Sequence, residues 1–189
     1  MSLKPVLNRV PVEILKFYLV EASLGVDCSG FVVNVLDEFL QEKIGISLYQ
    51  VIPRKAFPSF WRWLVFKLRP RLNLSAKILT SNFVSQPIGL HEVKSGDLIK
   101  FGSSHVALIS SVWRKSNEIK KIEYVHSTSD YGDQHGVRKD LIIIKNPSLP
   151  LERQLWQEND SKGCNWTKKD YLSAPPKERG LRRLIVLTC

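Results

Sequence analysis

Cysteine is scarce in this chain, which has three among its 189 residues: Cys28, Cys164 and Cys189. So few cysteines exclude a disulfide framework for a chain of this length. None of the spacings matches the paired C-x-x-C pattern of a structural zinc site. We therefore expect reduced thiols, of which one is a candidate for a reactive group.

Long apolar runs are also missing. No stretch reaches the roughly 18 consecutive apolar residues that indicate a transmembrane helix. Residues 1–11 contain no continuous apolar core and no small-residue cleavage site, so we expect no signal peptide. The localisation stays open between a bacterial cytoplasm and the cell envelope or secretion.

Acidic residues are absent from residues 43–91, a segment that holds eight Lys and Arg residues. Over the whole chain Lys and Arg number 28 and Asp and Glu 18, so the formal charge is +10. A basic balance predicts attraction to polyanions such as nucleic acid, anionic lipid or acidic cell-wall polymer, without choosing among them.

The length predicts a single domain over residues 1–189, with a basic aromatic insertion at about residues 46–91. Residues 11–22 show apolar spacing typical of a helix. A clearer helix begins at about Cys28, where Phe31, Val35 and Phe39 repeat every four residues. Gly45 suits the left-handed cap of that helix.

The second half of the chain predicts β-strands at residues 97–101, 105–112, 119–126 and 137–144, with a final strand at 184–187. Residues 146–180, rich in Pro, Gly and Asn, are predicted to be irregular. The fold class expected is α+β, with the cysteine-bearing helix packed on an antiparallel sheet.

Cys28 is the strongest candidate for chemistry, because the start of a helix stabilises a thiolate. His105 opens one predicted strand and His126 closes another, so a nucleophile, a base and an orienting group are available. The alternative is a buried structural thiol and two structural histidines. Cys164 and Cys189 have no activating neighbour in sequence.

Residues 27–32 read Asp-Cys-Ser-Gly-Phe-Val. This segment resembles the D-C-S-G-F-V signature of the NlpC-type cell-wall cysteine peptidase family. Further matches follow in the family's order. Residues 95–101 resemble its G-D-L segment, and residues 105–109 resemble its H-V-G-I-Y strand. Residues 124–127 resemble the segment with the third polar residue, and residues 136–137 resemble the G-V pair. Residues 52–54 resemble its L-P-R tripeptide. The ordered set spans residues 27–144.

The resemblance implies a papain-like fold with Cys28 as nucleophile, His105 as general base and His126 as orienting group. It further implies a peptidase or amidase of peptidoglycan peptides that needs no metal or organic cofactor. For substrate binding, the expected residues are Asp27, Ser29 and Tyr18.

The sequence also departs from the family, with Ala107 in place of a glycine and Lys100 at a commonly apolar position. These departures leave the substrate open. One alternative is a papain-like acyltransferase, deamidase or toxin amidase. Another is a non-enzymatic basic module that binds membrane or nucleic acid.

Residues 58–68 are apolar on nearly all sides and too short to span a bilayer. With their basic flanks they make residues 54–71 a candidate surface for anionic lipid. The other interpretations are a lid over the cleft or a helix that covers the core. Nucleic acid is not expected, because no nucleic-acid motif accompanies the aromatics.

Overall fold

The computed structural model describes residues 28–70, 73–128, 136–157 and 163–188, and Cys28 is described by its backbone alone. The predicted helix at residues 11–22 lies outside this part of the chain.

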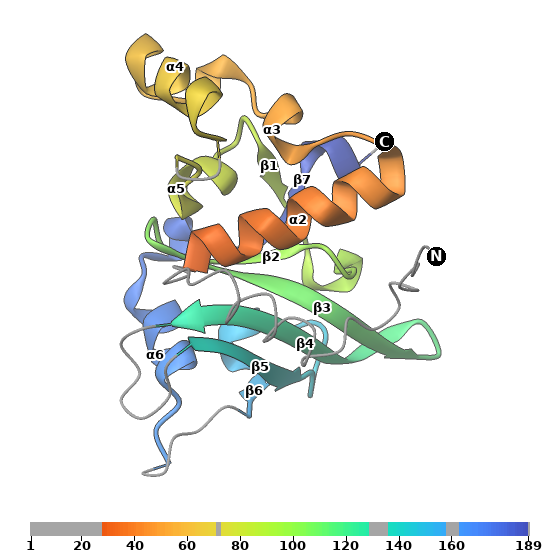
Figure 1. The fold of residues 1–189 in the computed structure, drawn as a ribbon. Helices are drawn as coiled ribbons and strands as arrows, with labels where there is room; N and C mark the ends of the chain where they lie inside the picture. Colours follow the sequence, from red (N-terminus) through yellow and green to blue (C-terminus); the bar gives the residue numbers. More distant parts are fainter. Residues whose placement is uncertain (1–27, 71–72, 129–135, 158–162, 189) are drawn as a thin grey trace.

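One sheet of seven antiparallel strands organises the molecule (Figure 1). Its order is β1-β7-β2-β3-β4-β5-β6, so the first and last of the strands pair near one edge. The strands are β1 (Ser85–Pro87), β2 (Leu98–Phe101), β3 (His105–Lys115), β4 (Glu118–Thr128), β5 (Gly136–Ile143), β6 (Leu155–Trp156) and β7 (Arg179–Leu184).

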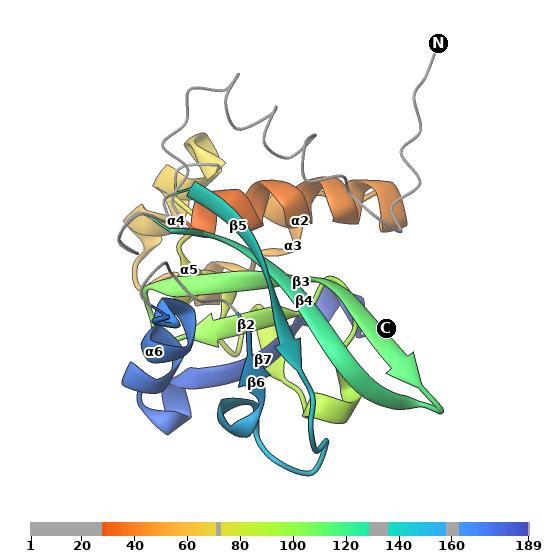
Figure 2. The same ribbon diagram turned by 90° about the horizontal axis from the view of Figure 1, so that it is seen from below.

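Helices lie on both faces of the sheet (Figures 1 and 2). The α-helices are α2 (Cys28–Ile44), α3 (Leu48–Val51), α4 (Phe60–Leu68), α5 (Ala76–Leu79) and α6 (Trp166–Ser173). Short 3-10 helices cover Arg54–Ala56, Leu90–Glu92, Leu151–Arg153, Pro176–Glu178 and Ile185–Leu187. Among the described residues, no helix combines the length and apolar character needed to cross a bilayer.

The helix predicted from about Cys28 is confirmed as α2, which packs on β3 and β4. Its buried stripe includes Phe31, Val32 and Leu36. Gly45 follows its last turn with φ +70°, as the predicted left-handed cap requires, and its N–H donates to the carbonyl of Gln41 at 3.0 Å. The α+β class and the antiparallel sheet are thereby confirmed.

Successive side chains of β3 point to opposite faces of the sheet and belong to two separate hydrophobic clusters. Val106 and Leu108 pack toward α2, while Ala107 and Ile109 pack into a second cluster on the opposite face. Tyr171 of α6 belongs to that second cluster. Because β3 is apolar on both faces, it can only be stable as a central strand.

The segment at residues 46–91 contributes to the main core. Leu48, Phe66 and Leu79 are fully buried there, and β1 pairs with β7. The segment is thus bound to the sheet through both its apolar side chains and its backbone.

Two sequence predictions were wrong. The final strand is β7 at Arg179–Leu184, whereas Ile185–Leu187 forms a 3-10 helix. Residues 146–180 are not irregular throughout, because α6 forms there behind an Asn165 side chain that accepts from the Lys168 N–H at 2.7 Å. β7 is hard to recognise in the sequence because it contains Arg182 and Arg183.

Candidate active site

His105 and His126 lie at the same end of the sheet, where β3 begins and β4 ends. The pairing of β3 with β4 brings them together, since Leu108 faces Val125 across the ladder. His105 Nε2 lies 3.0 Å from His126 Nδ1, and the rings meet edge to face. Two residues 21 positions apart thus share a hydrogen bond.

His126 is fully buried and has a carboxylate and a hydroxyl close to its second ring nitrogen. Nε2 lies 3.6 Å from Asp140 Oδ2 on β5 and 3.5 Å from Thr167 Oγ1 on α6. The carboxylate favours a proton on Nε2, because it stabilises the positive edge of the imidazole. In the tautomer with the proton on Nε2, His126 Nδ1 accepts and His105 Nε2 donates, so the direction of this hydrogen bond follows from the tautomer.

The tautomer of His126 determines which ring nitrogen of His105 carries the proton. With the proton of neutral His105 on Nε2, its Nδ1 carries the lone pair that can take a proton from a thiol. His105 is partly exposed, and its ring rests edge-on against the buried Phe101 at 4.9 Å. The His105 ring is therefore held by the edge contact with Phe101 and, through Nε2, by His126.

The backbone of Cys28 opens α2. In both views the N-terminal end of α2 lies over the end of the sheet where β4 terminates (Figures 1 and 2). The aligned peptide dipoles of the helix give that end a positive partial charge. The start of α2 and the two histidines therefore occupy the same end of the molecule.

The two groups approach from different faces of the sheet. Val106 packs in the cluster with α2, whereas His105 and His126 contact Phe101 and Tyr124 of the opposite cluster. A side chain at the helix start can therefore meet His105 only beyond the end of the strands.

The remaining predicted site residues fall into two groups. Ser29 is buried in the first turn of α2. Asp27 and Tyr18 lie outside the described residues, as does the side chain of Cys28. The structure therefore brings together His105 and His126, and it defines the helix that begins at Cys28.

Asp140 and Thr167 were missed by the sequence reasoning. Asp140 shares a sheet face with His126 because Arg138, two residues earlier, stands directly opposite His126. Only the register of β4 with β5 reveals this relation, so the sequence alone offered no signal for Asp140. Thr167 reaches the site through α6, which was not predicted.

In the part of the chain that the structure describes, His, Cys, Asp and Glu side chains nowhere gather in a group of three or more that could hold a metal ion.

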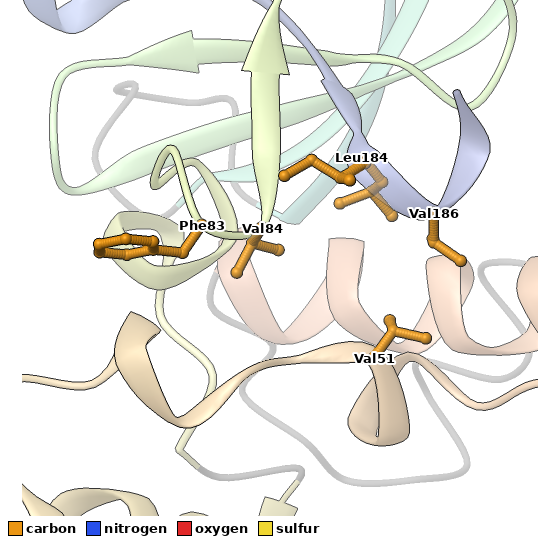
Figure 3. Close-up of a pocket in the computed structure, with 6 residues that line it drawn as sticks. Val51, Phe83, Val84, Leu184 and Val186 are labelled. Atoms are coloured by element: carbon orange, nitrogen blue, oxygen red, sulfur yellow. The ribbon is translucent and has the colours of Figure 1, made fainter. Parts of the chain in front are cut away.

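A small apolar hollow of about 170 Å³ lies apart from the histidines (Figure 3). Val51 at the end of α3 points toward Val84 and Val186, which flank β1 and β7. Its volume is below the roughly 300–1,000 Å³ of typical small-molecule sites. Without a polar side chain in its lining, it offers no group for catalysis.

Comparison of the chain with protein-family models, curated proteins and solved structures found no match.

Proposed function

We propose that this protein is a papain-like cysteine hydrolase of the NlpC type, which cleaves amide bonds in peptidoglycan peptides. The observation that carries the proposal is the 3.0 Å contact between His105 Nε2 and His126 Nδ1, at the end of the sheet where the helix headed by Cys28 begins. Two histidines that serve only the fold would not require a cysteine at the start of a helix at the same end of the sheet. A cysteine hydrolase requires the cysteine, a base and a group that orients the base.

In the proposed mechanism, His105 Nδ1 takes the proton of the Cys28 thiol and forms a thiolate–imidazolium pair. The sulfur attacks the amide carbonyl carbon, and the carbonyl oxygen becomes an oxyanion facing N–H groups at the start of α2. His105 then protonates the leaving nitrogen as the C–N bond breaks. Water, deprotonated by His105, attacks the thioester and releases a carboxylic acid and the free thiol.

His126 acts in this scheme as a positioning residue. It keeps the His105 ring in the orientation that presents Nδ1, and Asp140 stabilises the tautomer required. Asp27, Ser29 and Tyr18 stay proposals for substrate contacts. No step requires a cofactor.

The test is incubation with purified muropeptides of defined stem composition, followed by mass spectrometry. We expect cleavage by the wild type and at least about a 10³-fold loss of kcat in Cys28→Ala and in His105→Ala. Cys164→Ala and the exposed His91→Ala are the matched controls and should retain activity. An added amine that captures the acyl group in place of water would identify an acyltransferase instead.

The hydrolase proposal fails if no amide or ester substrate is cleaved. It also fails if Cys28→Ala and Cys164→Ala have the same activity.

A further inference from the structure

Helix α4 presents an apolar face to solvent. Phe60, Trp61, Val65 and Leu68 are 47, 72, 44 and 75% exposed. At 3.6 residues per turn these side chains share one face of the helix, and Phe66 occupies the opposite, buried face. A soluble domain rarely leaves such a contiguous apolar face uncovered without a binding role.

Cations border this face on both sides. Around the helix, Arg62 and Lys67 fall at the two boundaries between the exposed apolar face and the buried face. Arg54 from the preceding turn lies over the ring of Phe60 at 5.3 Å. No acidic residue occurs between Lys43 and His91, so nothing in this segment repels an anionic surface.

A shallow hollow of about 500 Å³ adjoins the start of α4. Arg54, Lys55 and Ser59 line it, together with Phe57 and Phe60. It therefore offers positive charge and a hydroxyl group directly beside the apolar face, which is the combination that a lipid phosphate and its acyl chains require.

We propose that α4 and the turn at Arg54–Ala56 dock on an anionic lipid bilayer, with the helix lying in the interfacial plane. Nine residues are too few to span the hydrocarbon, so the apolar face is buried only to the level of the acyl boundary. Figure 1 shows α4 projecting from the side of the molecule remote from β5 and β6. This position lets it reach a flat surface without moving the sheet.

The probe is flotation of the full chain with vesicles of phosphatidylcholine alone or mixed with phosphatidylglycerol. We expect binding to the mixed vesicles, weakened by salt, and a blue shift of tryptophan fluorescence that Trp61→Ser reduces. Arg62→Gln and Lys67→Gln should each lower partitioning about fivefold. Trp61→Ser should lower it about tenfold or more.

A second aromatic–cation pair supplies the matched control. Trp113 is 38% exposed and lies under Lys121 at 4.5 Å, on strands away from α4. Trp113→Ser and Lys121→Gln should leave vesicle binding unchanged. Cys28→Ala should also bind normally, which separates this surface from the proposed catalytic site. Thermal unfolding by circular dichroism verifies that each variant is folded.

Equal binding to both kinds of vesicle, or equal effects of Trp61→Ser and Trp113→Ser, would overturn the proposal. So would a lipid-free dimer that Trp61→Ser dissociates, or binding of an oligonucleotide through α4 with no binding to vesicles.

Discussion

His126 is the residue on which the candidate site depends most. It is buried, and it touches His105 through one ring nitrogen while Asp140 and Thr167 lie near the other. Its chain position at the end of a predicted strand was sufficient to select it as a candidate. Its contacts were not predictable, because they require the register of three strands and the docking of α6.

Two substitutions of His126 distinguish its proposed positioning role from its role in packing. Asn can reproduce a polar atom near Nδ1, whereas Ala cannot. We expect His126→Ala to lower kcat about 10–100-fold with KM little changed, and His126→Asn to recover part of that loss. Measuring kcat, KM and thermal stability for both variants tests this. Equal activity in the two variants, at equal stability, would contradict it.

Lys100 is the second informative residue, because it lies in the sheet and its pKa is lowered. Burial, and then the charge of Arg182, lower the pKa of Lys100, with Glu178 acting in the opposite direction. The folded state therefore binds this proton more weakly than the unfolded state. Below the folded pKa the charge destabilises the fold, and this penalty disappears as pH rises toward the ordinary value of 10.5.

Lys100→Met should accordingly raise the free energy of unfolding by about 0.5–1 kcal/mol at neutral pH. The difference from wild type should narrow as pH increases through the folded pKa. Urea unfolding over a series of pH values measures it, with the exposed Lys94→Met as control. A variant that is less stable than wild type at neutral pH would refute this account of Lys100.

At the scale of elements, helices and strands with a regular apolar pattern could be predicted from the sequence. Elements held in place by polar contacts could not. The stripe of α2 and the two-sided apolar character of β3 specify those elements locally. β7 contains Arg182 and Arg183, which look like surface residues. In the fold, Arg182 donates to the Ser85 side chain at 2.8 Å, and Arg183 pairs with buried Asp97. These contacts with residues far away in the sequence allow a strand that contains two arginines to be buried in the sheet.

The Arg183 pair gives the clearest prediction for an element. Its Nε and Nη2 lie 2.7 and 2.8 Å from the two oxygens of Asp97, which is almost inaccessible to solvent. Arg183→Ala leaves that carboxylate buried without its counter-ion, so the free energy of unfolding should fall by about 3–5 kcal/mol. Chemical denaturation is the measurement, and Asp97→Asn added to Arg183→Ala should restore part of the loss.

Lys120 is the control for that experiment, because it pairs with Glu118 at 2.6 Å but on the exposed surface. Because solvent screens this exposed pair, Lys120→Ala should leave the free energy of unfolding nearly unchanged. Similar losses for Arg183→Ala and Lys120→Ala would show that the Asp97 pair does not hold β7 in place.

At the scale of the whole molecule, the sheet separates two sets of groups that the proposed mechanism brings together. α2 lies on one face, and the histidine pair contacts the core of the other. The proposed chemistry therefore depends on the arrangement of side chains at the end of the sheet. The pairing of the seven strands determines that arrangement. The order of residues was enough to propose Cys28, His105 and His126 as a group, whereas the approach from opposite faces of the sheet emerged only from the fold.

The most direct test of the central claim is the pH dependence of Cys28 alkylation by iodoacetamide. In a Cys164→Ser, Cys189→Ser background, Cys28 is the single thiol. If His105 and the start of α2 activate it, the thiolate should form with a pKa near or below 7, and His105→Ala should raise that pKa. A pKa near the free value of about 8.5 with and without His105, or a thiol inert in the folded protein, would contradict the account.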